Sequence, residues 1–165
     1  MTDYDLICRQ AEELSKDKQW DITLYANISA LIFESLKDVN WAGFYLIREG
    51  ELQLGPFQGK TACTRIPVGK GVCGSAVAEK QIMRVADVHA FPGHIACDSA
   101  SASEIVIPLF LGGQIIGVLD IDSPVKERFS QDDEEGLLRI VHIIEKRGFW
   151  HDGGYSASPL MYIYN

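Results

Sequence analysis

The segments between residues 104 and 122 constrain the fold of this 165-residue chain most strongly. EIVIPLFL (104–111) and QIIGVLDID (114–122) are apolar almost throughout, and only Gly112 and Gly113 separate them. Two strand-like segments joined by a two-residue glycine turn predict an antiparallel β-hairpin. Because polar residues are rare in both segments, we expect both strands to lie centrally in a sheet that is covered on its two faces.

Apolar residues recur with a helical or a strand period elsewhere in the chain. The helical spacing predicts helices over residues 3–15, 21–36, 72–79 and 131–147. We expect strands over residues 41–47, from residue 52 to 54 and over 82–85, with a loop over 55–62. Asp21 and Ser130 are the expected N-caps of the second and the last helix. The order α-α-β-β-α-β-β-β-α predicts an α+β fold, a mainly antiparallel sheet with helices packed on its faces.

The overall composition excludes some classes of partner. A net charge of −8 and few clustered Lys and Arg argue against nucleic acid and anionic membranes as partners. No apolar run approaches the roughly 20 residues that span a bilayer, and the N-terminus lacks the pattern of a signal peptide. We therefore expect a soluble cytoplasmic protein whose four cysteines are thiols, ligands or catalysts rather than structural disulfides.

Reactive side chains concentrate in the loop sequence RVADVHAFPGHIACDSASASE (84–104). Loops of this kind, held between rigid strands, are frequent places for functional sites. Two further cysteines, Cys63 and Cys73, precede the Cys97 of this loop. The functional hypothesis depends on whether these three thiols meet in the folded chain.

The three cysteines allow three interpretations. His89, His94 and Cys97 with an acid could bind zinc, although they lack the spacing of the strong zinc signatures. Alternatively, all three cysteines are small packing residues without chemistry. The third interpretation is redox chemistry, in which Cys97 becomes a sulfenic acid and Cys63 or Cys73 condenses with it to a disulfide. Cys73 begins a predicted helix, where an exposed position would lower its pKa and a buried one would not.

Carboxylates and aromatic residues near the strand ends could complete such a site. Asp120 and Asp122 alternate with apolar residues, so they share one face of a buried strand, and at least one of their pKa values should be raised. An Asx turn before Pro124 is the alternative explanation of Asp122. Trp41 and Tyr45 also share a face; we expect Trp41 to form a wall of a small-molecule pocket and Tyr45 to pack in the core.

Three segments of the chain closely resemble the free methionine-(R)-sulfoxide reductases, which are single GAF domains. They are RIPVGKGVCGSA (65–76), VADVHAFPGHIACDSASASEIVIP (85–108) and GVLDIDSP (117–124). The resemblance covers roughly residues 20 to 147 and implies a single GAF domain over 1–147, with residues 1–20 forming an N-terminal helix. Residues 148–165 match nothing in the family and form a tail of unknown structure.

The resemblance implies a catalytic role for five residues. Cys97 matches the cysteine that attacks the sulfoxide sulfur, and Cys63 matches a resolving cysteine. Cys73 matches a third cysteine that takes part in disulfide formation in some members. Glu104 and Asp122 match carboxylates near the sulfoxide oxygen, where a neutral carboxylic acid supplies the proton for the departing oxygen.

The resemblance also implies how substrate and partners are bound. Asp120 matches a carboxylate for the substrate ammonium, and Trp41 matches the aromatic residue against the ε-methyl group. The other expected substrate contacts are Tyr45, Asp87, Ile95 and Ala96. The family needs no bound cofactor and no metal, uses thioredoxin as its external reductant, and includes several homodimers.

A GAF module that binds a ligand without catalysis is the alternative. Cyclic-nucleotide-binding GAF domains are similar to one another in an Asn-Lys…Phe-x3-Asp-Glu motif. This chain has the second half, Phe129-x3-Asp133-Glu134, but lacks the first. Because this half-motif coincides with the start of the last predicted helix, a structural role explains it equally well.

Overall fold

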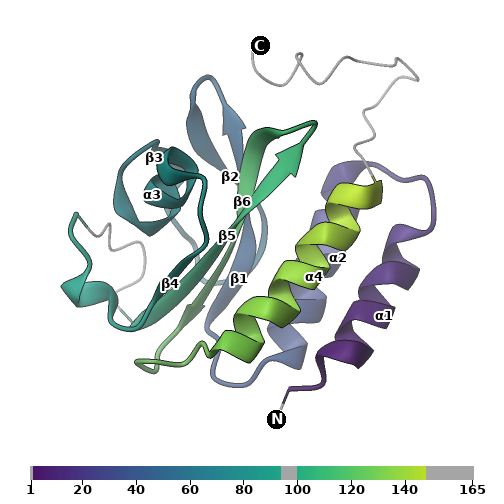
Figure 1. Ribbon diagram of the computed structural model, residues 1–165, viewed down its shortest axis with the longest axis horizontal. Coiled ribbons are helices and arrows are strands. Elements are labelled where there is room, and N and C mark those ends of the chain that lie inside the picture. Colours follow the sequence, from purple (N-terminus) through teal and green to yellow (C-terminus); the bar gives the residue numbers. More distant parts are fainter. Residues whose placement is uncertain (1, 94–99, 148–165) are drawn as a thin grey trace.

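The computed structural model describes residues 2–93 and 100–147, and its centre is one antiparallel sheet. Within these residues six strands follow the order β3-β2-β1-β6-β5-β4 (Figure 1). The strands are β1 (Trp41–Arg48), β2 (Glu51–Gly59), β3 (Arg65–Pro67), β4 (Met83–Val85), β5 (Ser103–Leu111) and β6 (Gln114–Ser123). All neighbouring strands are antiparallel, so the predicted α+β fold is confirmed.

Helices cover both faces of the sheet. Three long helices lie on one side of the sheet, two packed on its face and the third packed against these two, and a short helix packs on the other face (Figure 1). The long helices are α1 (Tyr4–Ser15), α2 (Asp21–Ser35) and α4 (Gln131–Arg147), the short one is α3 (Gly71–Glu79), and a 3-10 turn, η1 (Val88–Ala90), follows β4. Strands β5 and β6 are therefore covered on both faces, as their apolar sequences predicted. None of the described helices is long and apolar enough to cross a membrane.

The expected N-caps differ in outcome. Ser130 caps α4, because its hydroxyl accepts from the Asp133 amide at 3.2 Å and the Asp133 carboxylate accepts from the Ser130 amide at 2.8 Å. The prediction for Asp21 was wrong: Trp20 occupies the cap position, and Asp21 begins the helix. The buried Asp21 carboxylate instead accepts from the Arg147 guanidinium at 3.1 Å, because a carboxylate out of water needs a charged partner.

Two parts of the sheet differ from the sequence-based expectation. Strand β2 continues to Gly59, through residues expected to be a loop, because Gly55 permits the close approach of β1. A Cβ atom on Gly55 would lie 2.9 Å from the carbonyl oxygen of Phe44. Strand β3 was not predicted, since three residues show no periodicity; it pairs with Glu51–Gln53 of β2.

Candidate functional site

The sheet register brings carboxylates from two strands onto the face that α3 covers. Glu104 of β5 pairs with Asp122 of β6, and Asp122 pairs in turn with Trp41 of β1. Directly paired residues in antiparallel strands point to the same face, so these three side chains form a row across the sheet. Asp120 lies one row away, opposite Gly43 of β1.

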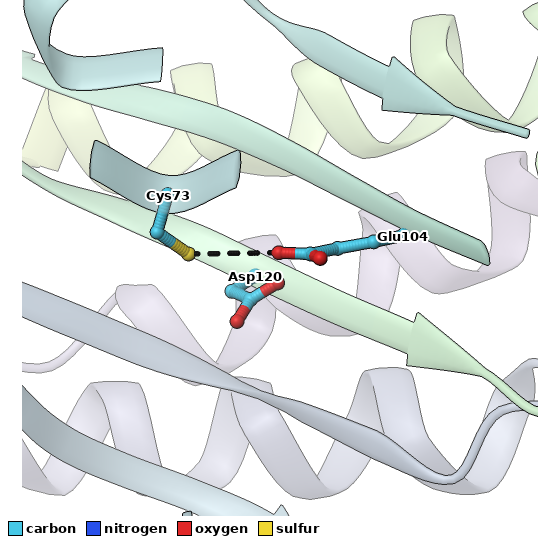
Figure 2. A group of neighbouring side chains, drawn as sticks. All are labelled: Cys73, Glu104 and Asp120. Carbon is cyan, nitrogen blue, oxygen red and sulfur yellow. Dashed lines mark hydrogen bonds between the residues drawn. The ribbon is translucent and has the colours of Figure 1, made fainter. Parts of the chain in front are cut away.

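Helix α3 adds a thiol to these carboxylates. Cys73, in the first turn of α3, points at the sheet, and its Sγ donates a hydrogen bond to Glu104 Oε1 at 3.8 Å (Figure 2). Gly74 makes this packing possible, because a Cβ there would lie 2.4 Å from the carbonyl oxygen of Pro67. One side-chain atom each of Cys73, Glu104 and Asp120 lies within 4.8 Å of the others, and all three residues are buried. We call these three residues the acidic cluster.

Burial controls protonation in the acidic cluster. It raises the pKa of Glu104 well above its ordinary value, and the charges of Asp120 and Asp122 raise it further. Burial also raises the pKa of Asp120, to about 6, although hydrogen bonds with Cys73 and Glu104 oppose the rise. The pKa of Cys73 is likewise raised by burial. Within the cluster Asp120 is therefore the group that ionises most readily, whereas burial favours the neutral forms of Glu104 and Cys73.

Two sequence-based expectations are decided by these shifts. The expectation that Asp120 or Asp122 has a raised pKa is confirmed for Asp120. For Cys73 the buried alternative holds, and the position in the first turn of a helix does not lower its pKa. The reason is that the thiol faces two carboxyl groups inside the protein rather than water at a helix end.

A stack of aromatic rings borders the acidic cluster. Trp41 stacks on Tyr45 with 5.8 Å between ring centroids and on Phe57 with 5.2 Å. Gly43 makes room for the indole, since a Cβ at that position would lie 2.8 Å from it. Sequence reasoning missed Phe57, although Gly43 within the bulky WAGFY segment was a signal of a closely packed ring. Trp41 and Tyr45 are both buried, as expected for Tyr45.

Two of the stacked residues, Trp41 and Tyr45, also make a polar contact. The Trp41 Nε1–H group donates to the carbonyl oxygen of Lys60 at 3.1 Å. The Tyr45 hydroxyl donates to the carbonyl oxygen of Cys63 at 2.9 Å. Both acceptors lie in the connection between β2 and β3, the segment that carries one of the candidate redox cysteines.

The cysteines occur in two states. Cys63 is disulfide-bonded, whereas Cys8 and Cys73 are free thiols. Cys8 is buried in α1 as a packing residue. Cys97, Ile95 and Ala96 lie outside the described residues.

Asp87 makes local contacts at the start of the reactive loop. Its carboxylate accepts from the His89 amide at 3.0 Å, which caps η1, and it pairs with the Lys126 ammonium at 2.6 Å. The hydrogen bond from Lys126 lowers the pKa of Asp87. These contacts join the stem of the loop to the connection between β6 and α4.

The acidic cluster is also where a metal ion would be sought among the described residues. Its donor set is one thiol and two carboxyl groups. Of the zinc set considered from the sequence, His94 and Cys97 lie outside the described residues.

Comparisons with known proteins agree with the fold and with the family that the sequence motifs indicated. Residues 22–146 match the GAF domain family. The chain is 64% identical over 121 residues to the free methionine-R-sulfoxide reductase of Escherichia coli K12, covering 73% of each chain. The reduced fRMsr of Staphylococcus aureus superposes with a TM-score of 0.87 at 54% identity, covering 89% of this chain and 96% of that one.

A second solved structure is the free methionine-R-sulfoxide reductase of Neisseria meningitidis in complex with its substrate. It matches with a TM-score of 0.84 at 45% identity, covering 87% of each chain. The protein is thus a GAF domain. Within that fold it belongs to the free methionine-R-sulfoxide reductase family, as the sequence motifs predicted.

Proposed function

We propose that this protein reduces free methionine-(R)-sulfoxide to methionine, with Cys97 as nucleophile, Cys63 as resolving cysteine and thioredoxin as external reductant. The observation that carries the proposal is the acidic cluster, in which the buried Glu104 and Asp120 lie together. Burial and neighbouring charge favour a protonated Glu104, and Asp120 ionises more readily. One site thereby offers both a proton donor and a negative charge. Reduction of a free methionine sulfoxide uses the proton for the departing oxygen and the negative charge for the ammonium group.

The charge requirement of Asp120 supports a free amino acid as substrate. Its Oδ1 atom is buried and has no hydrogen-bond partner among the described residues. An unpartnered carboxylate oxygen is costly to bury, and a substrate ammonium would satisfy it. A methionine sulfoxide inside a peptide has no ammonium to offer. We place the ε-methyl group against Trp41, at the start of the neighbouring strand.

The first chemical step joins the nucleophile to the substrate. The Cys97 thiolate attacks the sulfoxide sulfur, and the neutral Glu104, assisted by Asp122, gives a proton to the sulfoxide oxygen. The protonated oxygen then moves from the substrate sulfur to the Cys97 sulfur, while the sulfur–oxygen bond of the substrate and the newly formed sulfur–sulfur bond both break. Cys97 is left as a sulfenic acid. Methionine leaves, reduced by two electrons, while the cysteine sulfur is oxidised by the same two electrons.

The second step converts the sulfenic acid into a disulfide. The Cys63 thiol attacks the Cys97 sulfur, and the oxygen leaves as water. The disulfide-bonded state of Cys63 supports this pairing, because Cys8 and Cys73 are free and Cys97 is the remaining cysteine of the chain. Cys73 is buried with a raised pKa, and thiolates are the attacking species, so we assign the first resolving step to Cys63.

Recycling requires an external dithiol, which we propose is thioredoxin in the cytoplasm. Thioredoxin reduces the disulfide by exchange and restores both thiols. We also propose a homodimer, on the strength of the family resemblance. Light scattering on the reduced protein should give twice the mass of one chain; the mass of one chain would contradict the dimer without affecting the chemistry.

The decisive experiment compares three substrates in a coupled assay. NADPH consumption is followed with thioredoxin and its reductase, and free methionine-(R)-sulfoxide, its S epimer and a peptide-bound sulfoxide are offered separately. We expect turnover with the free R epimer alone. Failure with all three, while the coupling enzymes still reduce a small disulfide, would favour a ligand-binding GAF module without catalysis.

Cysteine variants separate the two chemical steps. Without reductant, Cys63→Ser should release about one methionine per subunit in a single turnover, and Cys97→Ser should release none. Cys8→Ala is the matched control, because this thiol packs in α1 away from the acidic cluster. Methionine formation by Cys97→Ser would contradict the assignment of the nucleophile.

A further inference from the structure

The connection between β2 and β3 is held to the sheet by the side chains of two aromatic residues. This connection carries Cys63. Residues 60–63 of the connection are exposed or half-buried. The Trp41 Nε1–H group donates to the Lys60 carbonyl at 3.1 Å, and the Tyr45 hydroxyl donates to the Cys63 carbonyl at 2.9 Å. The two hydrogen bonds therefore hold both ends of the four-residue segment 60–63, which we call the resolving segment.

Both donors are rigidly placed. Trp41 and Tyr45 lie four residues apart on β1, between β2 and β6, and their rings stack on each other. Trp41 and Tyr45 are only 3% and 2% exposed. Burial raises the pKa of Tyr45, so its hydroxyl keeps its proton and remains a donor. A hydrogen bond from a donor this well fixed limits where the acceptor backbone can lie.

We propose that Trp41 and Tyr45 are positioning residues for the resolving step: their hydrogen bonds hold the resolving segment so that the Cys63 thiol meets the sulfenic acid. This inference rests on the proposed function. It gives the Tyr45 hydroxyl a role in disulfide formation and not in contact with the substrate. It also means that the indole proposed to contact the substrate methyl group fixes the backbone beside the resolving cysteine.

The affected step is the attack of Cys63 on the oxidised cysteine. Cys63 loses its proton, a sulfur–sulfur bond forms, the sulfur–oxygen bond breaks, and the oxygen leaves as water. A disulfide forms only when the two Cα atoms approach to about 4.4–6.8 Å in a narrow geometry. Releasing one end of the resolving segment lowers the fraction of time in which Cys63 meets this requirement.

Tyr45→Phe tests the inference because it removes only the hydroxyl and keeps the stacked ring. In a single turnover without reductant, methionine release, free thiols and trapping of sulfenic acid by a cyclic 1,3-diketone are followed together. We expect about one methionine per subunit, with disulfide formation slowed about three- to tenfold and the sulfenic acid trapped in larger amount. Trp41→Phe, which removes the other donor, should slow the same step.

Tyr4→Phe is the matched control, since it also removes a buried tyrosine hydroxyl bond, to Asp133 at 2.8 Å, but on the helical face of the sheet. It should lower the melting temperature and leave the rate of disulfide formation unchanged. Disulfide formation at the wild-type rate in folded Tyr45→Phe and Trp41→Phe would overturn the inference. Slower methionine formation with a normal disulfide step in Tyr45→Phe would also overturn it, because the Tyr45 hydroxyl would then serve the substrate. A wild-type protein that releases no methionine would instead refute the proposed function.

Discussion

Two aspartates on opposite faces of the sheet are almost equally buried and have opposite pKa shifts. Asp133 of α4 is 6% exposed and Asp120 of β6 is 5% exposed. The pKa of Asp133 is lowered, whereas the pKa of Asp120 is raised to about 6. Burial is the largest single influence on both, so the difference comes from the partners that each carboxylate has.

Asp133 is surrounded by donors. Burial alone would raise its pKa, but hydrogen bonds from Ser130 and Tyr4 and the charge of Arg128 outweigh that effect. The Arg128 guanidinium lies 3.1 Å from the carboxylate. Through these contacts Asp133 caps α4 and joins it to α1, which explains the Phe-x3-Asp-Glu half-motif as structural.

Asp120 has acidic partners instead. Burial raises its pKa most. Hydrogen bonds with Cys73, Glu104 and the backbone of Ile121 lower it, and no cation among the described residues contributes. The effect of burial therefore outweighs that of the hydrogen bonds, and the pKa of Asp120 is raised. A buried carboxylate surrounded by donors and a cation stays ionised, whereas buried acids grouped together hold protons more tightly, and enzymes use such protons in catalysis. The predictions below test this contrast.

The largest effect is expected from Glu104→Gln. The amide occupies nearly the same volume but cannot release a proton to the sulfoxide oxygen, so kcat/KM for the free R epimer should fall about 10²- to 10⁴-fold. Glu134→Gln is the matched control, because Glu134 only pairs with Arg84 on the surface at 2.8 Å. A loss of less than about tenfold in Glu104→Gln would exclude Glu104 as the proton donor.

Asp120→Asn should weaken substrate binding and stabilise the fold. Loss of a charge-assisted bond to the ammonium should raise KM about 10- to 100-fold. Because the folded-state pKa of Asp120 lies above its ordinary value, its contribution to stability is present below about pH 4 and is lost as pH rises through about 6. Thermal denaturation at pH 8 should therefore show a higher melting temperature in the variant. A lower melting temperature would contradict the view that burying this carboxylate without a cation destabilises the fold.

Asp133→Asn should have the reverse outcome. The neutral amide loses the interaction with Arg128 and part of the helix cap, so the free energy of unfolding should fall by about 1–3 kcal/mol in urea denaturation. We expect kcat/KM at 25 °C to stay within about twofold of wild type, because Asp133 lies on the other face of the sheet from the acidic cluster. A large loss of activity in the folded variant would show that the two faces are coupled.

The smallest effect is the pH dependence of kcat/KM near neutrality. Asp120 must be ionised to bind the ammonium, so kcat/KM should fall about twofold from pH 8 to pH 6 and about tenfold per unit below that. Initial rates at subsaturating substrate measure this acidic limb, the fall of kcat/KM at low pH. The limb should be absent in Asp120→Asn; its persistence there would assign the titration to another group.

Sequence patterns predicted the elements whose physics is local. The hairpin of β5 and β6 follows from two apolar segments and a glycine pair, and the Ser130 cap follows from residues three apart. The shared face of Asp120 and Asp122 follows from the period of a strand. Family motifs added the roles of residues in the site, which no periodicity could supply.

Contacts between distant residues were outside the reach of these patterns. Asp21 looked like a helix cap because nothing near it in the sequence identifies Arg147 as its partner. Strand β3 exists only because β2 offers it an edge. Likewise, no local signal relates Trp41 and Tyr45 to the backbone of Lys60 and Cys63, which are 18 or more residues away.

By itself, the sequence determined which residues are acids, thiols and rings and which face of its own strand or helix each one takes. Long-range contacts in the folded chain bring Cys73 and Glu104 against Asp120 and bring Arg128 and Tyr4 against Asp133. The physical reason is that side-chain orientation depends on the local backbone, whereas protonation depends on desolvation and on charges supplied by distant parts of the chain.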